Sequence, residues 1–225
     1  MPKHAVIVAH PSPDSFTLSV ARTYCAGVRA AGQSAVLRDL YRINFDPILK
    51  ESEQPGDGPF TPAADVAAEL DLLAGSSAFV LVYPIWFGTP PAMLKGYIER
   101  VLGSGLSPRA LHSHLGRPPH PLLGGKQLLS FSSSGSTRQW LADQGAWVSL
   151  QTIFDGYLAR AFWMDTPHHV HFESIHEGLS QAKVAEHLAT VEQQASAMCS
   201  RLAAATSAAK AIAGEPRHPQ PQAQA

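Results

Sequence analysis

The chain contains little cysteine, little net charge and no long apolar run. Its two cysteines, Cys25 and Cys199, lie far apart and form no CxxC pair, which favours a reducing compartment. A formal net charge of -1 gives no reason to expect nucleic acid or an anionic membrane as a partner. No apolar run approaches membrane-spanning length, so we expect no membrane insertion. Residues 1–10 show no signal-peptide pattern, and we predict a soluble, cytoplasmic protein.

Several catalytic signatures are also missing. There is no GxxxxGK[ST] motif and no GxGxxG after the first apolar run, which argues against nucleotide hydrolysis and against a classical dinucleotide site. The serines of residues 132–136 do not form the GxSxG motif of a serine hydrolase. The cluster of His168, His169, His171 and His176 has neither a partner cysteine nor HExxH spacing, so we expect a loop or strand edge there and no metal.

Apolar runs and helical patterns alternate along the chain. Strands are predicted at residues 4–9, 34–40, 77–83, 126–131 and 161–164, and helices at 15–32, 61–74, 89–102, 139–147, 150–158 and 179–202. This alternation predicts an α/β fold with a doubly wound, parallel, five-stranded sheet and helices on both faces. We expect a single domain over residues 1–205 and a disordered tail over residues 206–225, which is rich in Ala, Pro and Gln.

The most informative segment spans residues 83–96. The buried strand that precedes it ends in a turn rich in proline and aromatic residues, with the sequence Tyr-Pro-Ile-Trp-Phe-Gly-Thr-Pro-Pro. Open α/β sheets bind ligands at the carboxyl ends of their strands. Backbone amides and apolar side chains in such a turn suit a flat aromatic cofactor, although a core strand with a tight loop would read similarly.

A second loop joins the first strand to a helix start at residues 10–17. Free amides and the positive end of the helix dipole favour a phosphate there, and the side chains of His10, Ser15 and Thr17 add donors. Ordinary helix capping by Asp14 or Ser15 is the alternative. The fourth strand ends in a third polar loop, at Ser132, Ser133, Ser134 and Gly135, so three strand ends converge on one edge of the sheet.

Four segments together resemble the NAD(P)H:quinone oxidoreductase family of the DT-diaphorase type, in particular its bacterial branch. They are Val-Ala-His-Pro at residues 8–11, Ser15-Phe16, Asp-Leu-Tyr at 39–41 with Asn-Phe-Asp-Pro-Ile at 44–48, and residues 83–96. The resemblance covers most of the chain, from residue 5 to the helix that starts near 179. It implies a flavodoxin-like fold with a tightly held flavin and a homodimer.

The resemblance also implies which residues hold the flavin. The first loop would bind the phosphate, the second the isoalloxazine ring and the third the pyrimidine edge of that ring. The residues concerned are His10, Ser15, Phe16 and Thr17; Pro84, Ile85, Trp86, Phe87 and Gly88; and Ser132, Ser133, Ser134 and Gly135.

Two of the chain's departures from the family pattern bear on the relay and on the choice of flavin. Trp140 and Ala146 fall near the positions of a tyrosine and a histidine that relay charge in the animal enzymes, so that relay is not carried over and the catalytic residues stay unassigned. The chain is also shorter at its end than the animal enzymes, which favours FMN, with FAD as the alternative.

The predicted function is FMN-dependent, two-electron reduction of quinones or related small acceptors by NADH or NADPH. The flavin would carry the hydride through N5, with ping-pong kinetics. Two alternatives belong to other classes of protein. One is a flavin-binding regulatory subunit of a membrane potassium-efflux transporter, as some relatives are. The other is a flavodoxin-type electron carrier, against which the aromatic turn and the near-neutral charge argue.

Overall fold

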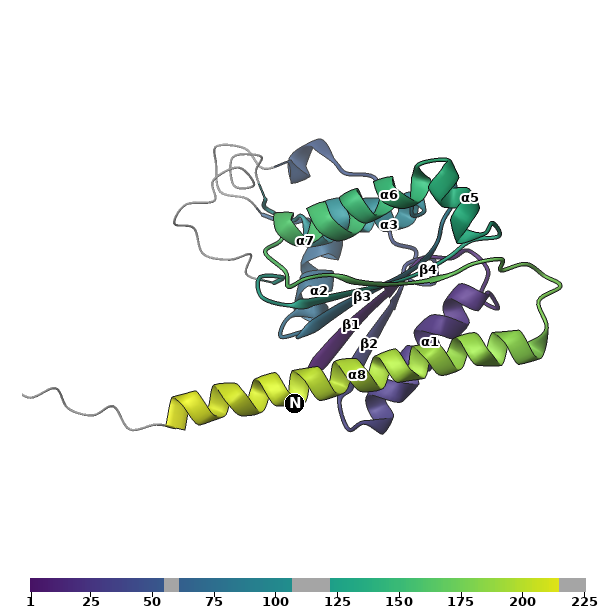
Figure 1. The fold of residues 1–225 in the computed structure, drawn as a ribbon. Helices are drawn as coiled ribbons and strands as arrows, with labels where there is room; N and C mark the ends of the chain where they lie inside the picture. The colour runs from purple at the N-terminus through teal and green to yellow at the C-terminus, as the bar shows by residue number, and fades with distance from the viewer. Residues whose placement is uncertain (55–60, 107–121, 215–225) are drawn as a thin grey trace, which may run out of the picture.

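Five parallel strands form one sheet in the order β2-β1-β3-β4-β5 (Figure 1). The computed structural model describes residues 1–54, 61–106 and 122–214. The strands are β1 (Lys3–Val8), β2 (Ser34–Asp39), β3 (Ala78–Pro84), β4 (Gln127–Ser133) and β5 (His168–Phe172). β3 is buried along its whole length, as a central strand covered on both faces must be. The predicted doubly wound α/β class is confirmed.

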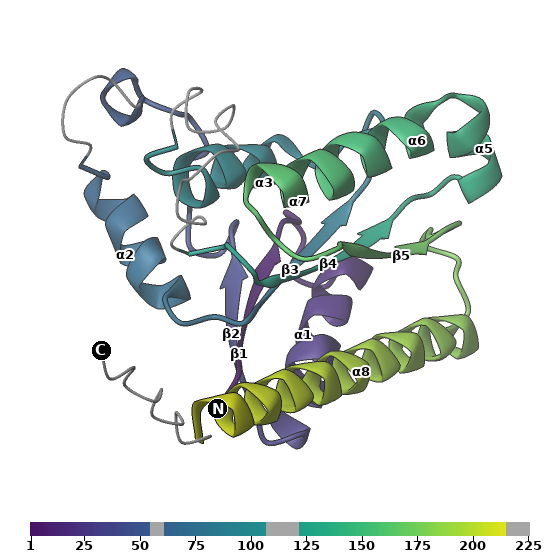
Figure 2. The same ribbon diagram turned by 60° about the vertical axis from the view of Figure 1, so that its left-hand side comes forward.

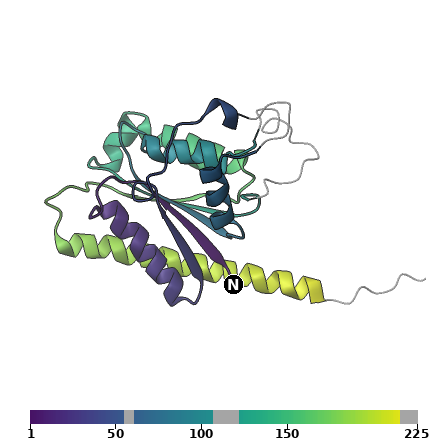
Figure 3. The same ribbon diagram turned by 180° about the vertical axis from the view of Figure 1, so that it is seen from behind.

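Helices cover both faces of the sheet. One face carries α1 (Phe16–Ala30) and α8 (Gln181–Gly214), which lie against each other (Figures 2 and 3). The other face carries α2 (Ala64–Leu73), α3 (Ala92–Tyr97) with its continuation η2 (Ile98–Leu102), and the run α5 (Arg138–Asp143), α6 (Ala146–Leu150), η3 (Gln151–Tyr157) and α7 (Leu158–Ala161). A short 3-10 helix, η1, spans Glu51–Glu53.

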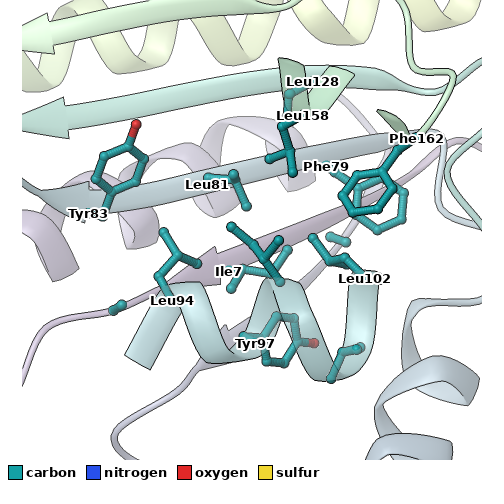
Figure 4. Close-up of a cluster of buried hydrophobic side chains, with 14 of the residues drawn as sticks. Ile7, Phe79, Leu81, Tyr83, Leu94, Tyr97, Leu102, Leu128, Leu158 and Phe162 are labelled. Atoms are coloured by element: carbon teal, nitrogen blue, oxygen red, sulfur yellow. The ribbon is translucent and has the colours of Figure 1, made fainter. Parts of the chain in front are cut away.

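Each face of the sheet has its own apolar cluster. On the face of α3 and α7, Ile7, Phe79 and Leu81 pack with Tyr97 and Phe162 (Figure 4). On the opposite face, the alternate residues of the same strands pack against α1 and α8, and Cys25 belongs to this second core, as predicted. The period of two along each strand thus sorts its residues between two cores.

Two elements differ from the sequence prediction. The predicted position of the fifth strand is wrong. Residues 161–164 end α7 and enter a loop, and the strand lies at His168–Phe172. A short apolar run can pack equally well as the end of a helix, and the histidine-rich strand at the edge of the sheet carries no apolar signal. In addition, α8 continues to Gly214, past the predicted end of the domain at residue 205, because its alanine-rich sequence is a strong helix former. Residues 215–225 lie outside the described part.

A buried arginine joins the segment after β2 to the helices. The guanidinium of Arg100, in η2, is buried and donates to the carboxylate of Glu53 (Nε to Oε2, 2.8 Å) and to that of Asp65 (Nη1 to Oδ2, 2.8 Å). The ring of Phe45 lies 5.2 Å from the guanidinium carbon. These bonds lower the pKa values of the Glu53 and Asp65 carboxyls.

We expect Arg100→Leu to lower the free energy of unfolding by about 3–5 kcal/mol, because the buried Glu53 carboxylate would lose its counter-ion. Urea denaturation at pH 7 measures the loss. Lys95→Ala is the matched control, since it breaks an exposed pair with Glu99 close by on the same helical run and should cost less than about 1 kcal/mol. Equal losses in the two variants would contradict this role for Arg100.

The same pair makes stability depend on pH. Because the folded state lowers the pKa of Glu53, its contribution is complete above the ordinary value near 4.3 and declines as the pH falls through the lowered one. Arg100→Leu should therefore lose less stability than the wild type between about pH 5 and pH 3.

Candidate functional site

Three loops meet at the carboxyl edge of the sheet and enclose two adjoining cavities. The first, of about 190 Å³, is lined by His10, Ser15, Phe16, Thr17, Pro84, Ile85, Trp86, Ser133, Ser134, Gly135 and Ile175. The second, of about 440 Å³, is lined by Ile85, Phe87, Gly88, Ser134, Gly135, Ser136, Trp140, Leu141, Gln144 and Ala146. Because Ile85, Ser134 and Gly135 line both, the cavities are two parts of one site. All but one of the residues proposed from the sequence line it.

The start of α1 forms the polar end of the site. Ser15 is the N-cap, and its Oγ accepts a hydrogen bond from the N–H of Leu18 at 3.2 Å. The cap leaves the Ser15 hydroxyl proton available, and helix geometry leaves the N–H groups of Phe16 and Thr17 without an intrahelical acceptor. These donors, at the positive end of the helix, suit an anion. Capping and anion binding are therefore compatible.

His10 borders the same end. Its Nδ1 lies 3.1 Å from the N–H of Ser12, and its ring centroid lies 5.7 Å from that of Trp86. Burial lowers the pKa of His10, and the nearby Arg42 guanidinium lowers it further, against the raising effects of the Ser12 bond and Asp39. An anion in the cavity would oppose this shift, because it favours the protonated ring.

The turn after β3 is a tight type I′ turn, with positive φ at both central residues, Phe87 (50°) and Gly88 (79°). Trp86 and Thr89 close it with two backbone bonds of 2.9 and 3.1 Å. A left-handed backbone is rare for a bulky residue, and here the side chain of Phe87 is also fully exposed. Strain combined with an exposed aromatic ring at a cavity mouth is typical of a binding loop.

The turn offers fewer free amides than the sequence suggests. The N–H of Ile85 donates to Ser133 O at 2.7 Å, and the N–H of Trp86 donates to Thr89 O, so neither is available to a ligand. Among the described residues, the N–H groups of Phe87 and Gly88 have no acceptor. Any ligand bonded by this turn would thus be held at its tip.

The loop after β4 divides its serines between two surroundings. Ser133, Ser134 and Gly135 line the cavities, whereas Ser132 lines neither, and its hydroxyl lies 2.6 and 2.8 Å from nitrogens of His169 and His171. Ser133 faces the opposite side of the sheet from Ser132, as the pleat requires, whereas Ser134 follows the end of β4 and both contacts His171 and lines the cavities.

Sequence reasoning assigned no binding role to the wall of the larger cavity, although Trp140 and Ala146 fall near the positions of the relay residues of the animal enzymes. Trp140 and Leu141 come from α5, and Gln144 and Ala146 from the turn that follows and the start of α6. The sequence also contains a capping signal: Thr137 caps α5 directly after the serine loop, so this helix starts at the site.

The described ranges contain no group of three or more His, Cys, Asp and Glu side chains that suits a metal ion. His168, His169 and His171 lie on the edge strand β5, and His176 follows it in a loop. None of the helices in those ranges combines the length and apolarity needed to cross a bilayer.

Comparison with known proteins shows which family the chain belongs to. Residues 2–195 match the family model described as flavodoxin-like fold. The chain belongs to the flavodoxin-like fold family. Among solved structures of this fold, the NAD(P)H:quinone oxidoreductase of Methanothermobacter marburgensis superposes with a TM-score of 0.71 at 23% identity, over 86% of this chain and 95% of that one. An FMN-dependent NADH-azoreductase of Bacillus anthracis, in complex with FMN, superposes with a TM-score of 0.64 at 16% identity, over 88% and 99%.

Curated proteins give matches of higher sequence identity. An NAD(P)H oxidoreductase of Haemophilus influenzae, itself uncharacterized, is 34% identical over 134 residues, which is 59% of this chain and 64% of that protein. The rat NAD(P)H dehydrogenase [quinone] 1 is 26% identical over 168 residues, 66% and 56% of the two chains. The matches thus span roughly half to two thirds of these relatives. The predicted relationship to the NAD(P)H:quinone oxidoreductases is confirmed.

Proposed function

We propose that the chain is an NAD(P)H-dependent oxidoreductase that holds FMN and reduces quinones or similar small acceptors by two electrons. The observation that supports this most directly is the shape of the site. A polar end built on the start of α1 adjoins a larger cavity with aromatic residues around it, and the two share one wall. That arrangement suits a ligand with a phosphate at one end and a flat ring at the other.

The donor set fits FMN. Ser15, Thr17, His10 and the first amides of α1 would hold the phosphate. Ile85 and Trp86 would border the ring, and Ser133, Ser134 and Gly135 its polar edge. FAD is the alternative cofactor. The relatives named as FMN-dependent or as NAD(P)H oxidoreductases lend support from outside the chain.

When bound, the flavin would accept hydride from the nicotinamide at N5 and pass it to the acceptor. The protein would position both partners. Phe87 and Trp140 both line the larger cavity, and their aromatic rings are suited to stacking on a flat ligand. The free amides at the tip of the turn and the hydroxyl of Ser134 would bond polar ring atoms. A single cavity for donor and acceptor implies that the two bind in turn, which is a ping-pong scheme.

The decisive experiment is the absorption spectrum of the purified protein. We expect a flavin band, FMN on heat release, and anaerobic bleaching by NADH or NADPH followed by recovery with a benzoquinone. Protein that takes up neither FMN nor FAD would overturn the proposal. Flavin binding without turnover would favour the regulatory subunit, and reoxidation only by a protein partner would favour the electron carrier.

Ser15→Asp should abolish flavin binding without unfolding the protein. An aspartate still caps α1, because a carboxylate accepts the N–H of Leu18 and suits the helix dipole. It would nevertheless repel the phosphate and compete for the same donors. We expect flavin affinity to fall by roughly 2–5 kcal/mol, as for disrupted charged contacts at buried interfaces. Fluorescence titration with FMN and far-UV circular dichroism measure the two effects.

Phe87→Ala is the matched variant at the other end of the site. Because Phe87 is fully exposed, its removal should leave the fold and most of the bound flavin intact. Weaker stacking should raise the apparent Michaelis constants for the nicotinamide or the acceptor more than it changes flavin content. If Ser15→Asp kept full flavin while Phe87→Ala lost it, the phosphate and ring ends would be assigned to the wrong loops.

We also propose a homodimer with the site partly at its interface. An apolar cavity of about 280 Å³ lies between η2 and the η3–α7 run, and Ile153 and Tyr157 beside it are each more than half exposed. Light scattering should give twice the 24.1 kDa mass of the chain. Ile153→Lys should shift it toward monomer, while Val148→Lys, at another exposed apolar position of the same helical run, should not. A monomeric wild type would refute the dimer.

A further inference from the structure

A continuous chain of hydrogen bonds leads from a buried carboxylate to the wall of the site. Asp155 Oδ2 lies 2.7 Å from His169 Nδ1, and His169 Nε2 lies 2.6 Å from Ser132 Oγ. Ser132 Oγ lies 2.8 Å from His171 Nδ1. His171 Nε2 lies 3.1 Å from Ser134 Oγ, which donates to Ser136 O at 2.7 Å. The five bonds thus join η3, β5 and β4 and end at the carbonyl of Ser136, and the last hydroxyl among them, that of Ser134, belongs to a residue that lines both cavities.

The side chains in this series of hydrogen bonds are shielded from water. The side chains of His169 and Asp155 are 5% and 8% exposed, and Ser132 is 2% exposed. The indole of Trp147 lies against both histidines, with its ring centroid 5.2 Å from that of His169 and 5.1 Å from that of His171. In such surroundings a polar atom without a partner costs about 1–3 kcal/mol, so every bond of the chain needs its proton.

Counting protons exposes a mismatch. Five hydrogen bonds need five protons. With Asp155 ionised and both histidines neutral, the two imidazoles and the two serine hydroxyls supply four. The hydroxyl of Ser134 would then have to serve both Ser136 O and His171 Nε2, which one proton cannot do. One additional proton, shared by Asp155 and His169, completes all five bonds.

Charge favours the same place for that proton. Among the described residues, the other oxygen of Asp155, Oδ1, is buried and has no hydrogen-bond partner, so His169 alone can balance an ionised carboxylate there. Burial and the neighbouring His169 lower the pKa of His171 to about 4, which keeps the extra proton off that ring. The other groups facing the chain are Tyr83 and Arg138, together with Glu173, which raises the pKa of His171.

We propose that this chain stores one proton at the Asp155–His169 pair and delivers it through Ser134 to an acceptor in the cavity. The role of this proton rests on the proposed function, because an acceptor that is reduced by a hydride also needs one proton. The Ser134 hydroxyl proton goes to the acceptor and is replaced by the proton on His171 Nε2. His171 Nδ1 takes the Ser132 proton, and Ser132 takes the one on His169 Nε2. Solvent later restores the missing proton, and Asp155 and His169 are positioning residues.

This transfer makes a prediction about ring tautomers that an ordinary structural network does not make. With five protons, both histidines carry a proton on Nε2. With four, both carry it only on Nδ1, and the Ser134 hydroxyl turns from Ser136 O to His171. His171 therefore changes tautomer without changing its charge, at the same pH at which the Asp155–His169 pair loses its proton.

Nitrogen-15 NMR of the histidine rings in ligand-free protein tests this directly between pH 5 and pH 10. We expect one shared midpoint for the tautomer change of His171 and the deprotonation at His169. Asp155→Asn should hold His171 in the Nε2–H form throughout, because an amide N–H can donate to His169 Nδ1 and completes the five bonds with a proton that does not titrate. His168→Gln, a change at the exposed histidine of the same strand, should leave the midpoint unchanged. In the wild type, separate midpoints for His171 and His169, or a single His171 tautomer at every pH, would overturn the proposal. If Asp155→Asn fails to fold, the titration of the wild type still tests whether His171 and His169 share one midpoint.

In the flavin-loaded protein, Asp155→Asn should lower kcat for a benzoquinone about 100-fold with little change in KM, the size expected for loss of a general acid. His168→Gln should retain wild-type kcat. The NMR titration needs neither flavin nor turnover. A protein without quinone reductase activity would therefore refute the proposed function, and the titration would still test independently whether the Asp155–His169 pair holds a proton. An unchanged kcat in Asp155→Asn, in an active enzyme, would refute delivery.

Discussion

The site depends on backbone bonds that continue the parallel ladders past the strand ends. The N–H of Ala9 donates to Val82 O at 3.1 Å, that of Ile85 to Ser133 O at 2.7 Å, and that of Ser134 to Phe172 O at 3.0 Å. Each bond fixes the first residue of one loop to the neighbouring strand. The phosphate loop, the aromatic turn and the serine loop are therefore held together by the sheet itself, and their side chains need only complete a site whose outline is already set.

Much of this arrangement is predictable from the sequence. Apolar runs alternating with helical patterns are enough to infer a parallel sheet, and a parallel sheet brings the carboxyl ends of its strands to one edge. The loops at residues 10–17 and 84–89 and at Ser133, Ser134 and Gly135 follow from that alone. Ser15 shows how far such reasoning goes. Capping and anion binding are alternatives in the sequence, whereas the structure shows Ser15 as the cap with its hydroxyl proton still free.

Other features depend on contacts that no local pattern encodes. Phe87-Gly88 is an unusual pair for a type I′ turn, so its left-handed backbone carries no sequence signal. The position of β5 was missed because His-His-Val-His-Phe is too polar to read as a strand. Its histidines are tolerated because β4 offers hydroxyls on the same face, and that pairing depends on the register in which Ser132 lies beside His171.

β4 shows how one strand serves two requirements. Leu129 and Phe131 face α1 and α8 and stabilise the core, whereas Ser130 and Ser132 face the opposite layer, where an apolar strand would have sufficed for packing. Burying Ser132 there is tolerable only because His169 and His171 bond it, and burying His169 requires Asp155 in turn. Such a polar network is a costly way to fill space. At the end away from Asp155, the network reaches Ser134 in the wall of the cavity, which is the position where a buried proton would be useful.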